Sequence, residues 1–139
     1  MPFAIGSKVA YPDRQVVLIS GDGAVGMNLM EFESAVRHNI PFLCIVCNDK
    51  SWGMTKHQHW LNYGKENTPA GHEMPFIKFH EIVKSMGGYG ELVEDPKDLI
   101  PAIERSIKSG LPSLINVLTN PDATSAATHA ITAMMTPKE

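Results

Sequence analysis

Three short segments of the chain are almost continuous in valine, isoleucine, leucine and other apolar residues, and they restrict the fold more than any other feature. These segments are Val16–Ser20, Phe42–Cys47 and Ser113–Leu118. Continuous apolar runs of this length are typical of parallel β-strands that are covered on both faces. A fourth run, Gly90–Val93, predicts another short strand.

Helical patterns lie between these runs. Leu29, Phe32 and Val36 are spaced three and four residues apart within Asn28–Asn39, which predicts a helix with one apolar face that ends before Pro41. Further helices are expected at Pro2–Ala10, at Ile77–Met86 and at Pro96–Ser109, the last with Asp95 as its cap and with Leu99, Ile103 and Ile107 as its buried stripe. Strands that alternate with helices predict an α/β domain with a parallel sheet and right-handed crossovers.

The composition suits one globular domain and excludes several classes of function. The chain has 139 residues and a formal net charge of −3, without a basic run, so nucleic-acid binding has no electrostatic basis. We predict no membrane association, because no apolar stretch approaches the roughly 18 residues of a membrane span. The N-terminal residues do not resemble a signal peptide, which makes a cytoplasmic protein the default expectation.

The two cysteines, Cys44 and Cys47, form a C-x-x-C pattern that is common in redox and metal sites. They lie inside an expected strand, however, and positions three apart on a strand point to opposite faces. We therefore interpret both as small buried apolar residues.

Two acidic residues follow two of the expected strands. Asp22 lies between Gly21 and Gly23, directly after the first strand, and Asn48-Asp49 follows the second. Because ligands of parallel α/β sheets bind beyond the carboxyl ends of the strands, both acids are expected at one edge. The glycines leave room for a ligand to approach closely, and the amides that follow lead towards a helix start, which attracts anions.

Asp22 and Asp49 offer the hard oxygen ligands that Mg²⁺ prefers, usually as one or two carboxylates together with phosphates and water. A turn over Asn48–Ser51 could add a backbone carbonyl. These residues predict a magnesium diphosphate site.

The spacing of Gly21-Asp22-Gly23 and Asn48-Asp49 resembles the thiamine-diphosphate motif, in which GDG precedes Asn-Asn by some two dozen residues. The stretches AIGSKVAYPDRQVVLISGDGAVGMNLMEFESAVRHNIPF and GYGELVEDPKDLIPAIERSIKSGLPSLINV resemble the C-terminal domain of the acetolactate synthase superfamily, and NDKSWGM is similar to its benzaldehyde lyase branch. The resemblance covers about residues 2–119. It implies a three-layer α/β sandwich with a mainly parallel sheet, truncated at its N-terminus, and the tail 120–139 is then a C-terminal arm.

The resemblance also implies roles for individual residues. The magnesium ligands would be the carboxylate of Asp22, the side chain of Asp49 and the backbone carbonyl of Ser51. The expected cofactor-binding residues are Gly21, Asp22, Gly23, Ala24, Asn48, Ser51, Trp52, Gly53 and Met54.

The chain departs from the family pattern at Asp49, where most members have asparagine. Two carboxylates cancel the charge of Mg²⁺, so a diphosphate is attracted less strongly unless Lys50 or Lys56 compensates. We expect Asp49→Asn to keep or tighten cofactor affinity. Loss of magnesium and cofactor binding in a titration of this variant would contradict that expectation.

The histidines do not form a metal pattern, because His57 and His59 are two residues apart and do not share a helix face. We interpret them mainly as surface or loop residues. A substrate contact by His57 or Gln58 stays open, because this segment runs near the active-site mouth in the family.

The resemblance implies that catalysis needs a glutamate from an aminopyrimidine-binding domain of the same or a neighbouring subunit. Glu31 and Glu33 follow the diphosphate turn and are not candidates, so no residue of this chain is predicted to be catalytic. We expect the chain to be a cofactor-binding half that is inactive alone and forms homo-oligomers such as dimers.

The implied reaction forms or cleaves a bond beside a carbonyl, as in acetolactate-synthase-like decarboxylation or carboligation of a small 2-oxo acid. Alternatives are a lyase for a 2-hydroxy ketone or acyl-CoA, of the benzaldehyde lyase, oxalyl-CoA decarboxylase or 2-hydroxyacyl-CoA lyase type, or a non-catalytic interaction domain. A dinucleotide binder is disfavoured, since no G-x-G-x-x-G follows the first strand.

Overall fold

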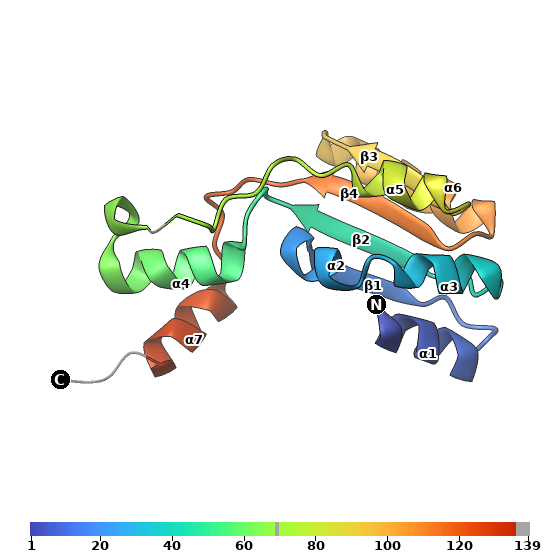
Figure 1. The fold of residues 1–139 in the computed structure, drawn as a ribbon, viewed down its shortest axis with the longest axis horizontal. Coiled ribbons are helices and arrows are strands. Elements are labelled where there is room, and N and C mark those ends of the chain that lie inside the picture. Colours follow the sequence, from blue (N-terminus) through green and yellow to red (C-terminus); the bar gives the residue numbers. More distant parts are fainter. Residues whose placement is uncertain (69, 136–139) are drawn as a thin grey trace.

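The computed structural model describes residues 1–68 and 70–135 and contains a four-stranded parallel sheet (Figure 1). The strands are β1 (Val17–Gly21), β2 (Leu43–Asn48), β3 (Tyr89–Val93) and β4 (Ser113–Leu118), in the order β1-β2-β4-β3. All three pairings are parallel, as the apolar runs predicted.

The strand ends place the two acids at one edge of the sheet. Gly21 pairs with Cys47 in the register, and Asn48 pairs with Leu118. Gly21 and Asn48 are the last residues of β1 and β2, one residue later than expected. Asp22 and Asp49 therefore follow neighbouring strands directly, at the same carboxyl edge.

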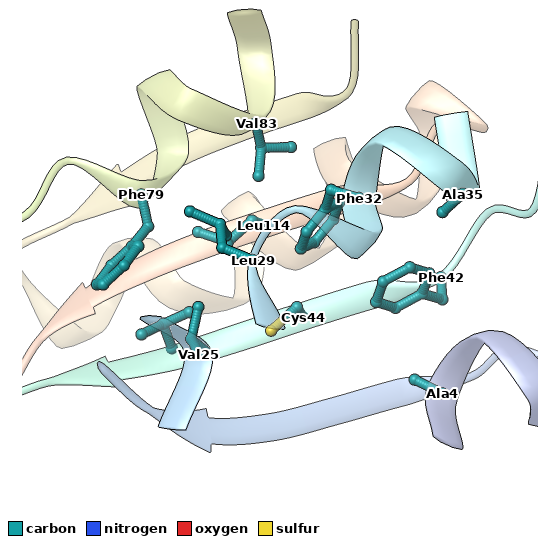
Figure 2. Close-up of a cluster of buried hydrophobic side chains, with 11 residues drawn as sticks. Ala4, Val25, Leu29, Phe32, Ala35, Phe42, Cys44, Phe79, Val83 and Leu114 are labelled. Carbon is teal, nitrogen blue, oxygen red and sulfur yellow. The ribbon is translucent and has the colours of Figure 1, made fainter. Parts of the chain in front are cut away.

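Four helices lie over one face of the sheet: α1 (Pro2–Ala10), α2 (Asp22–Asn28), α3 (Glu31–Arg37) and α5 (Phe79–Ser85). Figure 2 shows their apolar side chains pointing towards those of β2 and β4. Phe32 of α3 stacks on Phe42 with ring centroids 5.1 Å apart. The core on this face consists of Ala4, Val25, Leu29, Phe32, Ala35, Phe42, Cys44, Val46, Phe79, Val83 and Leu114.

The helix predicted over residues 28–39 is confirmed for Glu31–Arg37, but its start was wrong. The chain becomes helical at Asp22, and Leu29 and Met30 then form a tight turn in which their carbonyls accept hydrogen bonds from Phe32 and Glu33. This turn redirects the chain, so that Val25 of α2 and Phe32 of α3 both face the sheet. Along α3, Ala35 is fully buried, whereas Val36 is only partly buried.

The opposite face carries a second, smaller core beneath α6 (Leu99–Ser109), which makes the domain a three-layer sandwich. The short 3-10 helix η2 (Pro96–Asp98) precedes α6, and the Asp95 carboxylate accepts a hydrogen bond from the Lys97 amide, as its predicted capping role requires. The buried stripe was predicted incorrectly in part, because Ile107 is 47% exposed. Ala102 and Ser106 occupy the buried positions, since small side chains let α6 lie close to the sheet.

Helix α6 packs on β3 and β4 and leaves the edge strand β1 uncovered on this face. Val17 and Ile19 are 47% and 69% exposed as a result. Apolar side chains that face solvent on an edge strand are typical of a surface that another segment or subunit covers.

Beyond the carboxyl ends of the strands, α4 (Gly53–Tyr63) packs against α7 (Ala126–Met135) (Figure 1). The short 3-10 helix η1 (Lys65–Asn67) follows α4. The tail after Thr119, which we expected to be an arm, thus contains a helix that packs back on the domain as far as residue 135. The remainder of the expected arm, 136–139, lies outside the described residues. None of the described helices has the length and apolar character that a membrane crossing requires.

Candidate functional site

Two carboxylates converge on one backbone amide at the carboxyl edge of the sheet. The Ser51 N–H donates to Asp49 Oδ1 at 3.0 Å and to Asp22 Oδ2 at 3.3 Å. Asp22 opens α2 directly after β1, and Asp49 opens the loop after β2, so the parallel topology brings them together across 27 residues of sequence. Two acids that share one hydrogen-bond donor form a local concentration of negative charge.

Asp22 is the more buried of the two acids, at 3% exposure. Burial is the largest cause that raises the pKa of its carboxyl group, and the nearby Asp49 carboxylate raises it further. The amides of Gly23, Lys50 and Ser51 oppose this change, and Gly23 N–H donates to Asp22 Oδ1 at 2.9 Å. A bound cation would stabilise the ionised form of this carboxyl group.

The turn that carries Asp49 and Ser51 is held in an uncommon conformation. Lys50 has a φ of 60°, in the left-handed region that residues other than glycine rarely occupy. Its amide donates to Asn48 Oδ1 at 3.2 Å, and its carbonyl accepts from Met74 N–H at 2.7 Å. Strain of this kind persists where surrounding contacts fix the backbone, and it is common at ligand sites.

Asn48 was expected to contact the diphosphate, but its side chain points into the interior of the domain. Its amide nitrogen donates to the Ile77 carbonyl and to Asn116 Oδ1, at 3.3 and 3.1 Å, beneath the turn. The side chain is 1% exposed and is not among the residues that line the cleft. Asn48 therefore orients the turn from behind.

A cleft of about 740 Å³ opens in front of the two carboxylates. Eight of the nine expected cofactor-binding residues line it, and Asp49 lines it as well. The eight are Gly21, Asp22, Gly23, Ala24, Ser51, Trp52, Gly53 and Met54. The expected residues thus lie together at one cleft, and their contact with a cofactor stays a prediction.

Gly53 and Gly21 both lack a side chain at the cleft, but for different structural reasons. A Cβ at Gly53 would lie 2.5 Å from Asp49 Oδ2, so the carboxylate needs the bare backbone in order to occupy its position. A Cβ at Gly21 would meet nothing within 4 Å, and it would instead protrude into open space. Gly21 also lines the cleft, so a side chain at this position would reduce the room for a ligand.

The opposite wall of the cleft was not predicted. It comes from the segment after β4, and its residues are Thr119, Asn120, Ala123, Thr124, Ser125 and Thr128. A stretch rich in Thr and Ala carries little local signal. The pairing of β4 with β2 brings its first residues to the site, where the Thr119 amide donates to the Asn48 carbonyl at 2.9 Å, and α7 then packs on α4. Thr55 also lines the cleft without having been predicted.

Cys47 corrects the prediction that both cysteines are buried. Cys44 is buried in the core, but Cys47, on the other face of β2, is exposed and lines the cleft. The expected opposite orientation is thus confirmed, whereas burial is wrong for Cys47, because the sheet edge beside it has no covering helix. Partial burial, together with Asp22 and Asp49, raises the pKa of the Cys47 thiol.

His57 is 5% exposed and lines the cleft, so its interpretation as a surface residue was wrong. Its Nε2 lies 2.9 Å from the carbonyl oxygen of Pro121, and this contact ties α4 to the C-terminal segment. His80 is also buried, beneath the sheet edge, where its Nδ1 lies 3.3 Å from the Asn116 amide nitrogen. A substrate contact by His57 stays a prediction.

The donor set fits a magnesium diphosphate. Within residues 1–68 and 70–135 no three His, Cys, Asp or Glu side chains cluster as a metal site, so a bound ion would need ligands other than side chains. Two convergent carboxylates, a carbonyl at Ser51 and an open space at Gly21 suit Mg²⁺, which completes its octahedron with phosphate oxygens and water. The buried Ser51 hydroxyl, which forms no hydrogen bond with any described residue, adds a polar group at the same place.

Comparison with known proteins gives matches to a sequence family, to a solved structure and to curated proteins. The sequence model described as "Thiamine pyrophosphate enzyme, C-terminal TPP binding domain" matches residues 1–117. Among solved structures, the Rhodococcus jostii thiamine diphosphate-dependent 4-hydroxybenzoylformate decarboxylase superposes with a TM-score of 0.81 at 28% identity, over 89% of this chain and 23% of that chain.

Three curated relatives illustrate the range of similar proteins. A "Probable acetolactate synthase" of Mycobacterium bovis is 43% identical over 119 residues, which cover 86% of this chain and 21% of that protein. A sulfoacetaldehyde acetyltransferase of Alcaligenes xylosoxydans xylosoxydans is 35% identical, over 85% of this chain and 20% of that protein. A 2-hydroxyacyl-CoA lyase of Oryza sativa subsp. japonica is 33% identical, over 87% of this chain and 22% of that protein. The chain thus spans about a fifth of the length of these relatives.

Proposed function

The chain belongs to the family of C-terminal TPP-binding domains of thiamine pyrophosphate enzymes, and from this membership we propose that its cleft binds thiamine diphosphate through a magnesium ion. The observation that carries the proposal is the convergence of Asp22 and Asp49 on the Ser51 amide, beside the open space at Gly21. The two carboxylates alone would repel a diphosphate, so a divalent cation must lie between the carboxylates and the diphosphate.

We assign the magnesium ligands as the Asp22 and Asp49 carboxylates and the Ser51 carbonyl. Gly21, Gly23 and Ala24 would lie along the diphosphate, with Trp52, Gly53 and Met54 towards the thiazolium ring. Asn48 would act by holding the turn. When bound, thiamine diphosphate supplies a carbanion that reacts with carbonyl compounds, while the protein binds and orients it.

The parent reaction would form or cleave a bond beside a carbonyl. We favour acetolactate-synthase-like decarboxylation or carboligation of a 2-oxo acid, because the relative named a probable acetolactate synthase has the highest identity of the three. The second candidate is a lyase for a 2-hydroxy ketone or acyl-CoA, which the similarity to 2-hydroxyacyl-CoA lyase supports. Acetyl transfer is a related variant.

The activating glutamate would come from an aminopyrimidine-binding domain of the same or a neighbouring subunit. Glu33 forms an ion pair with Arg37 on the exposed side of α3 and does not line the cleft, and Glu31 does not line it either. We propose that residues 1–119 form the binding domain, that 120–139 form a C-terminal arm whose residues Asn120 to Thr128 help to line the cleft, and that these 139 residues alone do not turn over substrate. A cytoplasmic homo-oligomer such as a dimer completes the proposal.

Calorimetric titration of the chain tests the binding function. We expect thiamine diphosphate to bind when Mg²⁺ is present and not when the metal is chelated, and thiamine without its diphosphate not to bind under either condition. Asp22→Asn should abolish the metal-dependent heat, whereas Asp13→Asn, at an exposed position outside the cleft, should keep it. Metal-independent binding of thiamine would contradict the proposal.

A further inference from the structure

Lys56 is a buried cation behind the proposed metal site. The residue is 5% exposed, although lysine is rarely buried without a partner. Its ammonium lies 3.9 Å from Asp49 Oδ2, the oxygen that does not accept the Ser51 amide. On its other side it lies 5.2 Å from the centroid of the Trp60 ring, one helical turn further along α4. These two contacts fix the charge beside Asp49.

Lys50 does not have this relation to the site. Its side chain is exposed and lies 5.9 Å from the centroid of the Phe76 ring, on the outside of the turn. Among the ion pairs of the described residues, Lys56 pairs with Asp49 and Lys50 pairs with neither acid. Lys56 is thus the better placed of the two lysines next to the acids.

The charges of the three side chains determine what the site can attract. Asp22 and Asp49 supply two negative charges and Lys56 supplies one positive charge. With Lys56 in place, a bound divalent cation leaves the site one positive charge with which to hold an anion. Without Lys56, the two carboxylates would neutralise the metal completely, and a diphosphate would meet no net attraction.

We propose that Lys56 is a positioning and charge-compensating residue that lets a site with two carboxylates bind a divalent cation and a diphosphate together. In this arrangement the pair Asp49–Lys56 is electrostatically equivalent to a neutral side chain at position 49. The proposal rests on the proposed function for the identity of the anion, but its effect on metal binding does not depend on thiamine.

The first test measures Mn²⁺ alone, with free metal counted by electron paramagnetic resonance. Lys56→Met should bind Mn²⁺ about tenfold more tightly than the unchanged chain, because a repelling charge is removed. Asp49→Asn should bind it about tenfold more weakly, and the double variant Asp49→Asn with Lys56→Met should return to the unchanged value. Lys56→Arg, which keeps the charge, and Lys108→Met, which removes an exposed lysine of α6, should leave the affinity unchanged.

The second test repeats the series with thiamine diphosphate at saturating Mg²⁺. The order should reverse: Lys56→Met should bind the cofactor about tenfold more weakly, and the double variant should recover. Because removal of both partners of a buried ion pair can also restore stability, urea denaturation of each variant is measured alongside and should show that all of them are folded under the titration conditions. Lys56→Arg again serves as the variant that keeps the charge.

Each outcome is decisive. Equal Mn²⁺ affinities for Lys56→Met and Lys108→Met, or a double variant as impaired as Lys56→Met, would overturn the inference. The predicted Mn²⁺ order without any binding of thiamine diphosphate would support the role of Lys56 and refute the proposed function. If thiamine diphosphate binds equally well to all variants, the proposed function is supported and the role of Lys56 is refuted. If no variant binds metal, both the role of Lys56 and the proposed function are contradicted.

Discussion

Gly21 lies at the end of β1, where a Cβ would extend into the cleft without touching any atom within 4 Å. We expect Gly21→Ala to leave the free energy of unfolding nearly unchanged and to weaken thiamine diphosphate binding about tenfold, because the methyl group would occupy ligand space. Calorimetry with Mg²⁺ and urea denaturation measure the two effects. Gly26→Ala, which also meets nothing within 4 Å but lies outside the cleft lining, is the matched control, and an equal loss of affinity there would contradict the assignment.

The two cysteines differ in reactivity because they lie on opposite faces of β2. Burial raises the pKa of the Cys44 thiol to about 12, so it should not react with a thiol reagent at pH 8 until the protein unfolds. Cys47 is exposed at the cleft and should be labelled in the folded protein. Mg²⁺ with thiamine diphosphate should slow its labelling by covering it. Mass spectrometry of timed samples checks both statements. Labelling of Cys44 as fast as Cys47 in the folded protein, or labelling of Cys47 that the ligand does not slow, would contradict them.

At this scale the sequence predicted the acids and glycines of the cleft floor, because each follows directly from a strand end. It could not predict the exposure of Cys47, which depends on how far α6 reaches across the sheet. It also could not distinguish Lys50 from Lys56 as a neighbour of Asp49, because that depends on the left-handed turn at Lys50.

At the scale of elements, α3 is stabilised mainly by Phe32, which is fully buried and stacks on Phe42. We expect Phe32→Ala to lower the free energy of unfolding by about 3–5 kcal/mol, since it leaves a cavity that this core cannot refill. Phe3→Ala, at a position 92% exposed, should change stability by less than about 0.5 kcal/mol. Urea denaturation compares the two variants, and similar losses would mean that Phe32 is not a core residue.

Helix α6 is tied to β3 by Arg105 and Glu91, whose carboxylate also accepts from the Tyr89 hydroxyl. The hydrogen bond from Arg105 lowers the pKa of the Glu91 carboxyl group below its usual value of 4.5. The pair therefore stabilises the fold above pH 4.5, and this contribution is lost as the pH falls through the lowered value. Glu91→Gln should be less stable at pH 7 and should lose less stability between pH 7 and pH 3. An unchanged acid profile of urea midpoints would contradict this role.

The strands were predicted to within one residue because continuous apolar runs mark buried parallel strands directly. The break between α2 and α3 was not predictable from periodicity, since the spacing of Leu29, Phe32 and Val36 continues across the turn. The helix at Ala126–Met135 was missed for another reason. Its four alanines favour a helix, but the segment has no charged residue to mark an outer face, and its packing partner α4 lies far away in the sequence.

At the scale of the whole molecule, the cleft is lined by residues at the carboxyl edge of the sheet, at the start of α4 and in the segment that leads into α7. Figure 1 shows α4 and α7 beyond this edge of the sheet. One wall follows β1 and β2, and the other follows β4, so the topology of the parallel sheet places all its components at one end. The uncovered face of β1 lies on the same sheet, with Val17 and Ile19 exposed. Both features suit a domain that works against further protein surfaces.

The central claim is that this edge of the sheet holds a diphosphate through a magnesium ion. A crystal structure of the chain grown with Mg²⁺ and thiamine diphosphate tests it most directly. The account predicts an octahedral ion with ligand distances of about 2.1 Å to the Asp22 and Asp49 carboxylates and the Ser51 carbonyl, with diphosphate oxygens completing the coordination beside Gly21. A diphosphate bound elsewhere, or held in this cleft without a metal between it and the two carboxylates, would contradict the claim.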